Sequence, residues 1–107
     1  MKLLLISTKD PISHEHPELV LEIAKIAKEK GAHVKIFLIE DGVLLRKGQE
    51  IEEKVKETAE AGISIKAEDI SLKTRGVSED KLVDNIEVSN LDELFDSIIE
   101  FDRVVWF

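Results

Sequence analysis

The sequence predicts an α/β fold in which a mainly parallel sheet of five strands lies between layers of helices. Segments of strand length alternate with segments of helical periodicity along the whole chain, which is typical of strand–helix–strand units. The first segment, Lys2–Ser7, reads KLLLIS and is apolar on both faces, as expected for a strand buried in a parallel sheet. Gly31 and Gly62 each end a helical pattern just before the next strand begins.

The composition indicates one globular domain, which we take as residues 1–107. Hydrophobic residues make up 43% of the chain and charged residues 36%, so a core is combined with a heavily charged surface. The net charge of −8 argues against nucleic-acid binding, because phosphate backbones are bound mainly by lysine and arginine. The abundance of Lys and Glu also resembles the composition of thermophile proteins.

The chain has no cysteine, which excludes disulfides, thiolate metal sites and a thiol nucleophile of its own. Apolar runs such as Leu3–Ile6 are far too short to cross a bilayer, and the N-terminus does not read as a signal peptide. We therefore expect a cytoplasmic protein that has no membrane contact.

The elements follow in order after the first strand. A loop over Thr8–His16 precedes a helix in which Pro17 takes the first position, since proline suits that place. The second strand, His33–Ile39, ends at Glu40-Asp41-Gly42. A second helix is predicted over about Lys47–Ala61, because Ile51, Val55 and Ala59 recur at a spacing of four residues.

The third strand is predicted from Ile63 to about Lys66, followed by a loop over Ala67–Val77. Ser78 is predicted to be the N-cap of a short helix. Residues Ile86–Val88 are predicted to form a short fourth strand. Asn90 begins the clearest amphipathic helix of the chain, and Arg103–Phe107 forms a terminal strand. The apolar face of that helix consists of Leu91, Leu94, Phe95, Ile98 and Ile99.

Polar groups are concentrated in the loops that follow the first three strands. In an open parallel sheet these loops lie at the carboxyl edge, where such folds bind ligands. The candidate residues there are Asp10, Ser13, His14, His16, Asp41, Glu68, Asp69, Ser71 and Arg75. The five glycines are scattered rather than clustered, which argues against a dinucleotide or P-loop site.

Two histidines in the first loop have two interpretations. His14 and His16 would serve as metal ligands with a carboxylate from Asp10 or Asp41. The more common arrangement, and the one we favour, is a solvated pair in which His16 caps the helix that Pro17 begins. We predict no metal and no cofactor.

The third loop offers acid/base, nucleophilic and anchoring interpretations. Glu68 and Asp69 would act as paired carboxylates if one raised the pKa of the other, although adjacent residues often point apart. Ser71 has no histidine base placed near it by sequence. Arg75, before Gly76, suits either an anchor for the loop or an anion ligand, and the anchoring role is favoured.

The residues in this loop resemble the DsrE/DsrF/DsrH family of sulfur-relay proteins. The similarity rests on the order of elements, on Asp10-Pro11, on FLIEDGV at Phe37–Val43 and on EDISLKTRGV at Glu68–Val77. Family members carry a cysteine after the third strand, a small residue three positions later, and Arg-Gly seven and eight positions later. In this chain Ser71, Arg75 and Gly76 match that spacing, and Glu68 stands where the persulfide-carrying cysteine would be.

The resemblance implies a flavodoxin-like three-layer α/β/α fold and a homo-oligomer, with a trimer favoured and a dimer or hexamer as alternatives. It also implies a site near subunit contacts at the end of the third strand. The ligand-binding residues expected at this site are Asp10, His14, Asp41, Glu68, Ser71, Arg75 and Gly76. Because a carboxylate cannot carry sulfur as a thiolate does, we expect a non-catalytic binding or partner subunit rather than a persulfide carrier.

Two alternatives remain at the level of sequence. One is a small enzyme in which Glu68 acts with Asp69, His14 or Asp41 as acid/base groups or metal ligands. The other is a purely structural subunit whose apolar helix faces form an oligomer interface. For the binding or partner subunit, the expected ligand is either a small molecule or a protein partner of the sulfur relay.

Overall fold

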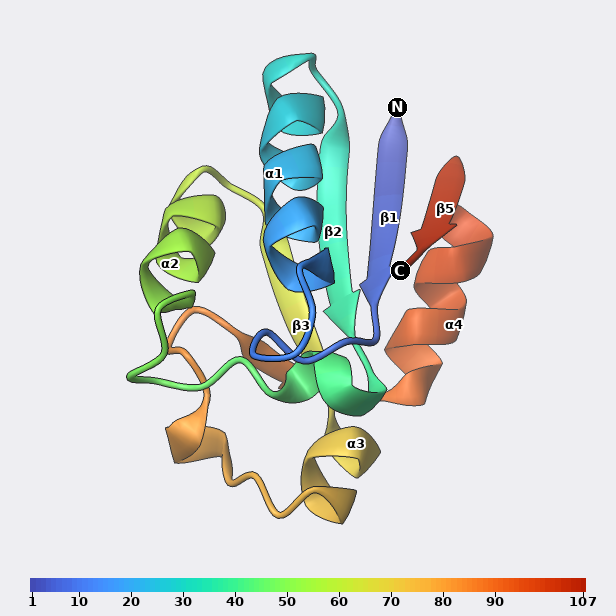
Figure 1. The fold of residues 1–107 in the computed structure, drawn as a ribbon. Helices are drawn as coiled ribbons and strands as arrows, with labels where there is room; N and C mark the ends of the chain where they lie inside the picture. Colours follow the sequence, from blue (N-terminus) through green and yellow to red (C-terminus); the bar gives the residue numbers. More distant parts are fainter.

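The computed structural model describes residues 1–107 and contains a five-stranded sheet covered by helices (Figure 1). The strands are β1 (Lys2–Ser7), β2 (His33–Leu38), β3 (Ser64–Glu68), β4 (Glu87–Ser89) and β5 (Arg103–Trp106). The helices are α1 (His16–Glu29), α2 (Glu52–Glu60), α3 (Asp69–Thr74) and α4 (Leu91–Glu100), with short 3₁₀ turns η1 (Glu40–Val43) and η2 (Glu79–Lys81). The predicted order of the five strands is therefore confirmed, and so are the helices α1, α2 and α4, whereas α3 lies where a loop was predicted and the short helix predicted at Ser78 is the turn η2.

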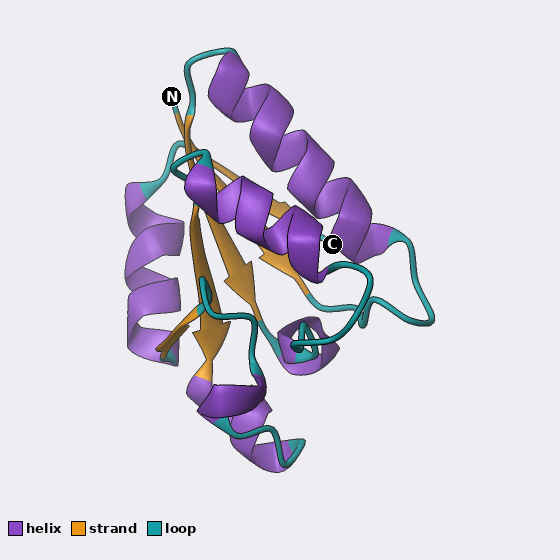
Figure 2. Cartoon of the chain, turned by 90° about the vertical axis from the view of Figure 1, so that its left-hand side faces the viewer, coloured by secondary structure: helices purple, strands orange, loops and turns teal.

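All neighbouring strands are parallel, and their order in the sheet is β4-β3-β2-β1-β5. The chain moves from β1 to β4 in one direction across the sheet, and β5 then returns to the far side of β1. Right-handed connections place helices on opposite faces when the direction of travel reverses. Figures 1 and 2 show this result: α1 and α2 cover one face and α4 covers the other, giving three layers.

The core is divided by the sheet because side chains alternate along each strand. Leu3 and Leu5 of β1 belong to the larger cluster under α1 and α2, together with Val20 and Val55 of those helices. The smaller cluster on the opposite face contains Leu4, Ile6, Phe37, Ile39, Leu94 and Phe101. The strand β1 is thus apolar on both faces, as its sequence predicts.

Several predicted boundaries are wrong by a few residues, for local reasons. The second helix begins at Glu52 rather than Lys47, because the chain turns at Gly48, which has a φ of 90°. The first helix begins at His16, and its N-cap is Glu15 rather than His16. The predicted loop Ala67–Val77 instead contains the end of β3 and the helix α3.

The apolar face predicted for α4 is only partly buried. Leu94 is buried, whereas Phe95 and Ile99 expose 62% and 70% of their surface. The neighbouring strand β5 is also exposed and lies at the edge of the sheet on the same side of the molecule (Figure 1). We call these exposed residues the α4–β5 apolar surface: Leu91, Phe95, Ile98, Ile99, Val104, Val105 and Trp106.

None of the helices combines the length and the apolar character that crossing a bilayer requires.

Candidate functional site

The carboxyl ends of the central strands lead into the segments that carry the predicted site. The strand β1 leads to the first loop, β2 to η1 and β3 directly to α3. Figure 1 shows η1 and α3 together beyond the ends of β2 and β3. Ser7 and Gly42 are in close contact there, since a Cβ added to Gly42 would lie 2.0 Å from the carbonyl oxygen of Ser7. Only glycine therefore allows η1 to pack against the end of β1.

Glu68 ends β3 and caps α3. Its backbone is extended, with a φ of −75° and a ψ of 130°, and its side chain turns back over the first turn of the helix. The Ile70 N–H donates to Oε2 at 2.6 Å, while the Ser71 N–H and hydroxyl donate to Oε1 at 3.0 and 2.5 Å. The carboxylate thus satisfies donors that the first turn of a helix leaves without partners.

The Glu68 side chain is buried, yet it is held in its ionised form. Burial alone would raise the pKa of this carboxyl group, because an apolar environment disfavours the charge. Hydrogen bonds from the Ser71 hydroxyl and from the Ile70 N–H stabilise the charge and outweigh burial, so that the pKa is lowered. An ionised carboxylate engaged in this way is a poor proton donor near neutral pH.

Ser71 connects α3 to η1. Its hydroxyl donates to Glu68 and accepts from the backbone N–H of Glu40 at 2.8 Å. Glu40 is the one non-glycine residue with a positive φ, 51°, a conformation that costs energy for a side chain larger than glycine. The hydrogen bond that the Glu40 N–H donates to the Ser71 hydroxyl helps to hold Glu40 in this strained turn.

Arg75 makes a second connection between the same elements. Its Nε donates to Oδ1 of Asp41 at 2.8 Å, and its Nη1 donates to the Ser71 carbonyl oxygen at 3.3 Å. Gly76 follows with a φ of 64°, and the N–H groups of Gly76 and Val77 return to carbonyl groups of α3. This pattern is a Schellman ending, for which glycine is the preferred residue.

The structure therefore joins four of the predicted residues and one further residue, Glu40, into one set of contacts. We call this set, formed by Glu40, Asp41, Glu68, Ser71 and Arg75, the η1–α3 network. Gly76 ends the helix that carries it. Sequence reasoning missed Glu40, whose contribution is a backbone N–H and a strained φ that no side-chain pattern reveals.

Asp10 and His14 form a separate group in the first loop. Asp10 Oδ1 accepts from the N–H groups of Ile12 and Ser13 at 3.0 and 2.8 Å, and its Oδ2 lies 3.3 Å from His14 Nδ1. Hydrogen bonding to the Ser13 N–H is the main cause that lowers the pKa of Asp10. The ring of His16 lies 6.0 Å from that of His14.

The two groups do not combine into one catalytic or metal-binding cluster. Asp41 pairs with Arg75 rather than with His14. Asp69, the other carboxylate of the predicted pair, accepts from the Ile70 N–H at 2.8 Å. No group of three or more His, Asp or Glu side chains is arranged to hold a metal ion.

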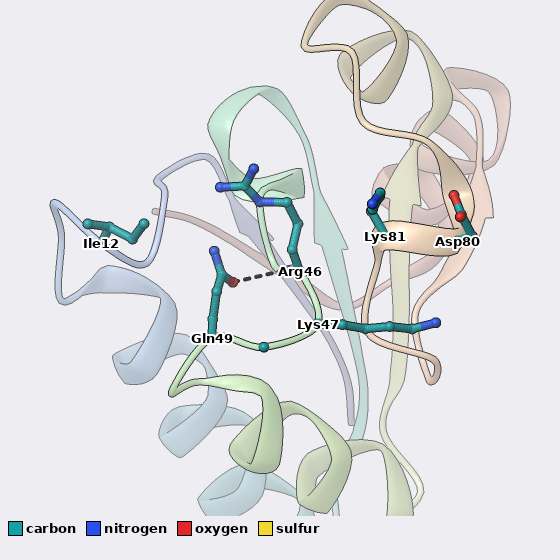
Figure 3. Close-up of a pocket in the computed structure, with 7 residues that line it drawn as sticks. Ile12, Arg46, Lys47, Gln49, Asp80 and Lys81 are labelled. Atoms are coloured by element: carbon teal, nitrogen blue, oxygen red, sulfur yellow. Dashed lines mark hydrogen bonds between the residues drawn. The ribbon is translucent and has the colours of Figure 1, made fainter.

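The hollows of the surface lie elsewhere on the molecule. The largest, of about 580 Å³, is lined by Ile12, Arg46, Lys47, Gly48, Gln49, Asp80 and Lys81 (Figure 3). No residue of the η1–α3 network lines it or either of the two smaller hollows. Neither Arg46 nor Gln49 was among the residues that the sequence singled out.

The full chain, residues 1–107, matches the family model described as the DsrE/DsrF-like family. It is 33% identical to the uncharacterized protein MK0008 of Methanopyrus kandleri, over 96% of this chain and 91% of that protein. It is 30% identical to the uncharacterized protein MJ0989 of Methanocaldococcus jannaschii, with both chains covered completely.

The fold is similar to those of solved structures with lower sequence identity. The ychN protein of E. coli superposes with a TM-score of 0.88 at 22% identity, covering 100% of this chain and 99% of that one. The protein of unknown function MTH1491 from Methanobacterium thermoautotrophicum gives a TM-score of 0.81 at 17% identity, covering 99% and 98% of the two chains. These similarities support the α/β fold.

Proposed function

Because this chain belongs to the DsrE/DsrF-like family, we propose that it is a non-catalytic binding or partner subunit in intracellular sulfur transfer. The observation that carries the proposal is the state of Glu68, which occupies the position of the sulfur-carrying cysteine by the spacing to Ser71 and Arg75. Its carboxylate is committed to capping α3. In this position the side chain supports the structure and does not perform chemistry.

The chemistry of sulfur transfer supports the same conclusion. A persulfide forms when a thiolate attacks the outer sulfur of a persulfide donor, the donor's S–S bond breaks and the donor leaves as a thiolate. This chain contains no cysteine, and a carboxylate forms no comparable stable bond to sulfur. The protein therefore contributes binding or assembly, and the sulfur remains on a partner that has a thiol.

The enzyme alternative receives less support from the geometry. A general acid must hold a proton near neutral pH, whereas hydrogen bonds from Ser71 and Ile70 lower the pKa of Glu68 despite burial. A general base must direct a free carboxylate oxygen at its substrate, whereas both Glu68 oxygens already accept hydrogen bonds from α3. Such an enzyme would also need Asp69, His14 or Asp41 as a second group. Asp69 accepts from the Ile70 N–H beside Glu68, whereas His14 pairs with Asp10 and Asp41 with Arg75.

A sulfur-labelling experiment tests the proposal. The chain is incubated with a ³⁵S-labelled persulfide donor and with a cysteine-bearing DsrE-like carrier, and each protein is then separated under denaturing, non-reducing conditions. We expect the label on the carrier and none on this chain, with binding between the two proteins measurable by calorimetry. Label that stays covalently on this chain would overturn the proposal, and so would the absence of binding to any persulfidated carrier tested.

Two cysteine variants test the assigned position. Glu68→Cys places a thiol at the end of β3, whereas Glu60→Cys places one at the exposed end of α2. If position 68 is the family site, Glu68→Cys accepts label from the donor or carrier much faster than Glu60→Cys. Equal labelling of the two variants would show that position 68 has no special relation to sulfur donors.

We also propose that the chain assembles as a homo-oligomer, with a trimer favoured over a dimer or hexamer, and that the α4–β5 apolar surface lies in its interface. Supporting this, Phe95, Ile99 and Trp106 each expose more than half of their surface. Exposed apolar side chains gathered in this way are typical of interaction sites. In addition, β5 presents an unpaired strand edge, which soluble proteins normally cover.

Native mass spectrometry of the purified protein tests the assembly. Ile99→Glu should shift the population toward monomer, whereas Ile26→Glu, an exposed apolar position on α1, should not. A strictly monomeric wild-type protein would refute this part of the proposal.

A further inference from the structure

The largest hollow of the surface is shown in Figure 3, and it is separate from the residues on which the proposed role in sulfur transfer rests. It lies between the first loop, the turn that precedes α2, and η2. Its volume of about 580 Å³ falls within the range of about 300–1,000 Å³ found for small-ligand sites. In the η1–α3 network the polar groups bond to one another, whereas several polar groups that line this hollow have no partner in the protein.

The backbone fixes the two segments that form the basic side of this hollow. Arg46 and Leu82 form an antiparallel β-bridge. The Lys47 N–H donates to the Lys81 carbonyl oxygen at 2.9 Å, and the Val83 N–H donates to the Leu45 carbonyl oxygen at 3.2 Å. Arg46, Lys47 and Lys81 are thereby held next to one another by main-chain bonds rather than by their side chains.

The Gln49 amide is oriented by the same turn. Its Oε1 accepts from the backbone N–H of Arg46 at 2.8 Å, which leaves the Nε2 group as the free end. Nε2 is shielded from solvent and has no hydrogen-bond acceptor in the protein. A shielded donor without an acceptor costs about 1–3 kcal/mol, so this group provides a reason for an acceptor to enter. Figure 3 shows the Gln49 amide and the Arg46 guanidinium extending to the same side of the loop.

The charges around the hollow favour an anion. Neither the Arg46 nor the Lys81 side chain takes part in any of the ion pairs of the structure. Lys47 pairs with Asp84, which lies outside the hollow, and the Asp80 carboxylate accepts from the Ser78 hydroxyl. Three cations and one carboxylate line this surface, in a chain whose net charge is −8.

An apolar side chain faces this basic surface from the first loop. Ile12 exposes 77% of its surface and lines the hollow. Its position is set by Asp10, whose Oδ1 accepts from the Ile12 and Ser13 N–H groups. Asp10 thus holds the backbone that carries Ile12, whereas the sequence predicted Asp10 as a ligand-binding residue of the site at the end of the third strand.

We propose that this hollow binds a small organic compound carrying a tetrahedral oxyanion, such as a phosphate or sulfate monoester. The oxyanion lies between Arg46 and Lys81, and one of its oxygens accepts from Gln49 Nε2. Since no ion pair restrains the Arg46 and Lys81 side chains, they can turn to admit that oxygen. The uncharged body of the ligand lies against Ile12.

Titration of the ¹⁵N-labelled protein with three probes tests the proposal. The probes are inorganic phosphate, phenyl phosphate and phenol, and the amide signals are followed by NMR. We expect both phosphates to shift signals of residues 46–49 and 81 together with the Gln49 side-chain amide, with phenyl phosphate binding more tightly. Phenol alone should bind weakly or not at all. Equal affinity for the two phosphates would refute the contact with Ile12, and shifts scattered over all surface lysines would refute the site.

Three variants and one control make the test specific. Gln49→Glu keeps an oxygen for the Arg46 N–H but replaces the free donor with a carboxylate, so the turn is retained and the oxyanion is repelled. We expect Gln49→Glu, Arg46→Gln and Lys81→Gln each to weaken phenyl phosphate binding by about tenfold or more. Lys73→Gln removes one exposed cation of α3 that takes part in none of the ion pairs, and it should leave the affinity unchanged. Equal weakening by Lys73→Gln, or normal binding by Gln49→Glu in a folded protein, would overturn the proposal.

Discussion

Replacing Glu68 with glutamine keeps the size of the side chain that caps α3 and removes its charge. In the wild-type protein both carboxylate oxygens accept hydrogen bonds, one from the Ile70 N–H and the other from the Ser71 N–H and hydroxyl. Glutamine has one carbonyl oxygen, so its NH₂ group must face at least one of these donors. The variant thus places two donors against each other in a site where the wild-type residue exposes only 4% of its surface.

The size of the effect follows from these contacts. Hydrogen bonds to a charged group contribute about 1.5–3 kcal/mol, and loss of an N-cap costs about 0.5–2 kcal/mol. Asp69 Oδ1 also accepts from the Ile70 N–H, at 2.8 Å, and compensates part of the loss. We therefore expect Glu68→Gln to lower the free energy of unfolding by about 2 kcal/mol, which for a domain near 100 residues is about 8 °C in Tm.

The pH dependence gives this prediction a distinctive signature. The pKa of Glu68 is lowered in the folded protein: burial opposes ionisation, but the Ser71 and Ile70 hydrogen bonds outweigh it. In the unfolded chain a glutamate titrates near about 4.3. The stabilisation by Glu68 is therefore complete above the unfolded pKa and is lost as the pH falls through the lower, folded pKa. Glutamine does not titrate, so the stability difference between the two proteins should be largest near neutral pH and shrink below about pH 4.

Chemical denaturation followed by circular dichroism, repeated between pH 7 and pH 3 at one protein concentration, measures this difference. Constant protein concentration is needed because assembly would contribute to the apparent stability. Glu60→Gln, at the exposed end of α2, is the matched control and should differ little from wild type at any pH. The reasoning is refuted if Glu68→Gln is as stable as wild type at pH 7, or if its deficit does not change as the pH falls.

Three further substitutions probe the same edge of the sheet by thermal denaturation. Gly42→Ala should destabilise the protein by about 3 kcal/mol, because the added Cβ would lie 2.0 Å from the Ser7 carbonyl oxygen; a normal Tm would contradict the tight contact. Gly76→Ala should cost only about 1 kcal/mol, since its φ is 64° but the space around it is open, and a much larger loss would indicate contacts beyond the helix end. Ser71→Ala should cost about 1–3 kcal/mol because it leaves the strained Glu40 N–H without its acceptor, and a neutral effect would argue against that hydrogen bond.

The sequence was most informative where burial decides the structure. The run Lys2–Ser7 is apolar on both faces because β1 lies at the interior of a sheet covered on two sides, and its pattern predicts this directly. Helix starts were less predictable where a turn interrupts the pattern. The segment after Lys47 has charged residues suited to a helix, but the turn at Gly48 and the bridge between Arg46 and Leu82 delay the start of α2 to Glu52. That bridge joins residues distant in sequence, so no local pattern reveals it.

The same limit applies to the amphipathic pattern of α4. A periodic apolar face predicts that the face is covered, but the pattern does not say by what. Within α4 only Leu94 and Ser97 are buried, and Phe95 and Ile99 are exposed. Asn90, in contrast, was predictable as a cap because its contact is local: its side chain accepts from the Glu93 N–H at 2.9 Å.

The contrast between the two polar regions explains why the candidate site was only partly predictable. Sequence reasoning gives priority to ionisable groups that lie close together, and it therefore selected Glu68, Asp41 and Arg75. In the structure these groups satisfy one another, with Arg75 paired to Asp41 and Glu68 bonded to α3. Satisfied groups stabilise the fold and have little remaining capacity for a ligand.

Binding capacity depends instead on polar groups that the protein places near a surface and leaves without partners. Gln49 Nε2 is such a donor, and the Arg46 and Lys81 side chains beside the same hollow have no ion-pair partner. None of the three belongs to a recognisable motif, because they are brought together by main-chain bonds between two loops. In this protein, therefore, the charged residues of α3 and η1 hold the edge of the sheet together, and the turn before α2 supplies the unpartnered groups on which our ligand proposal rests.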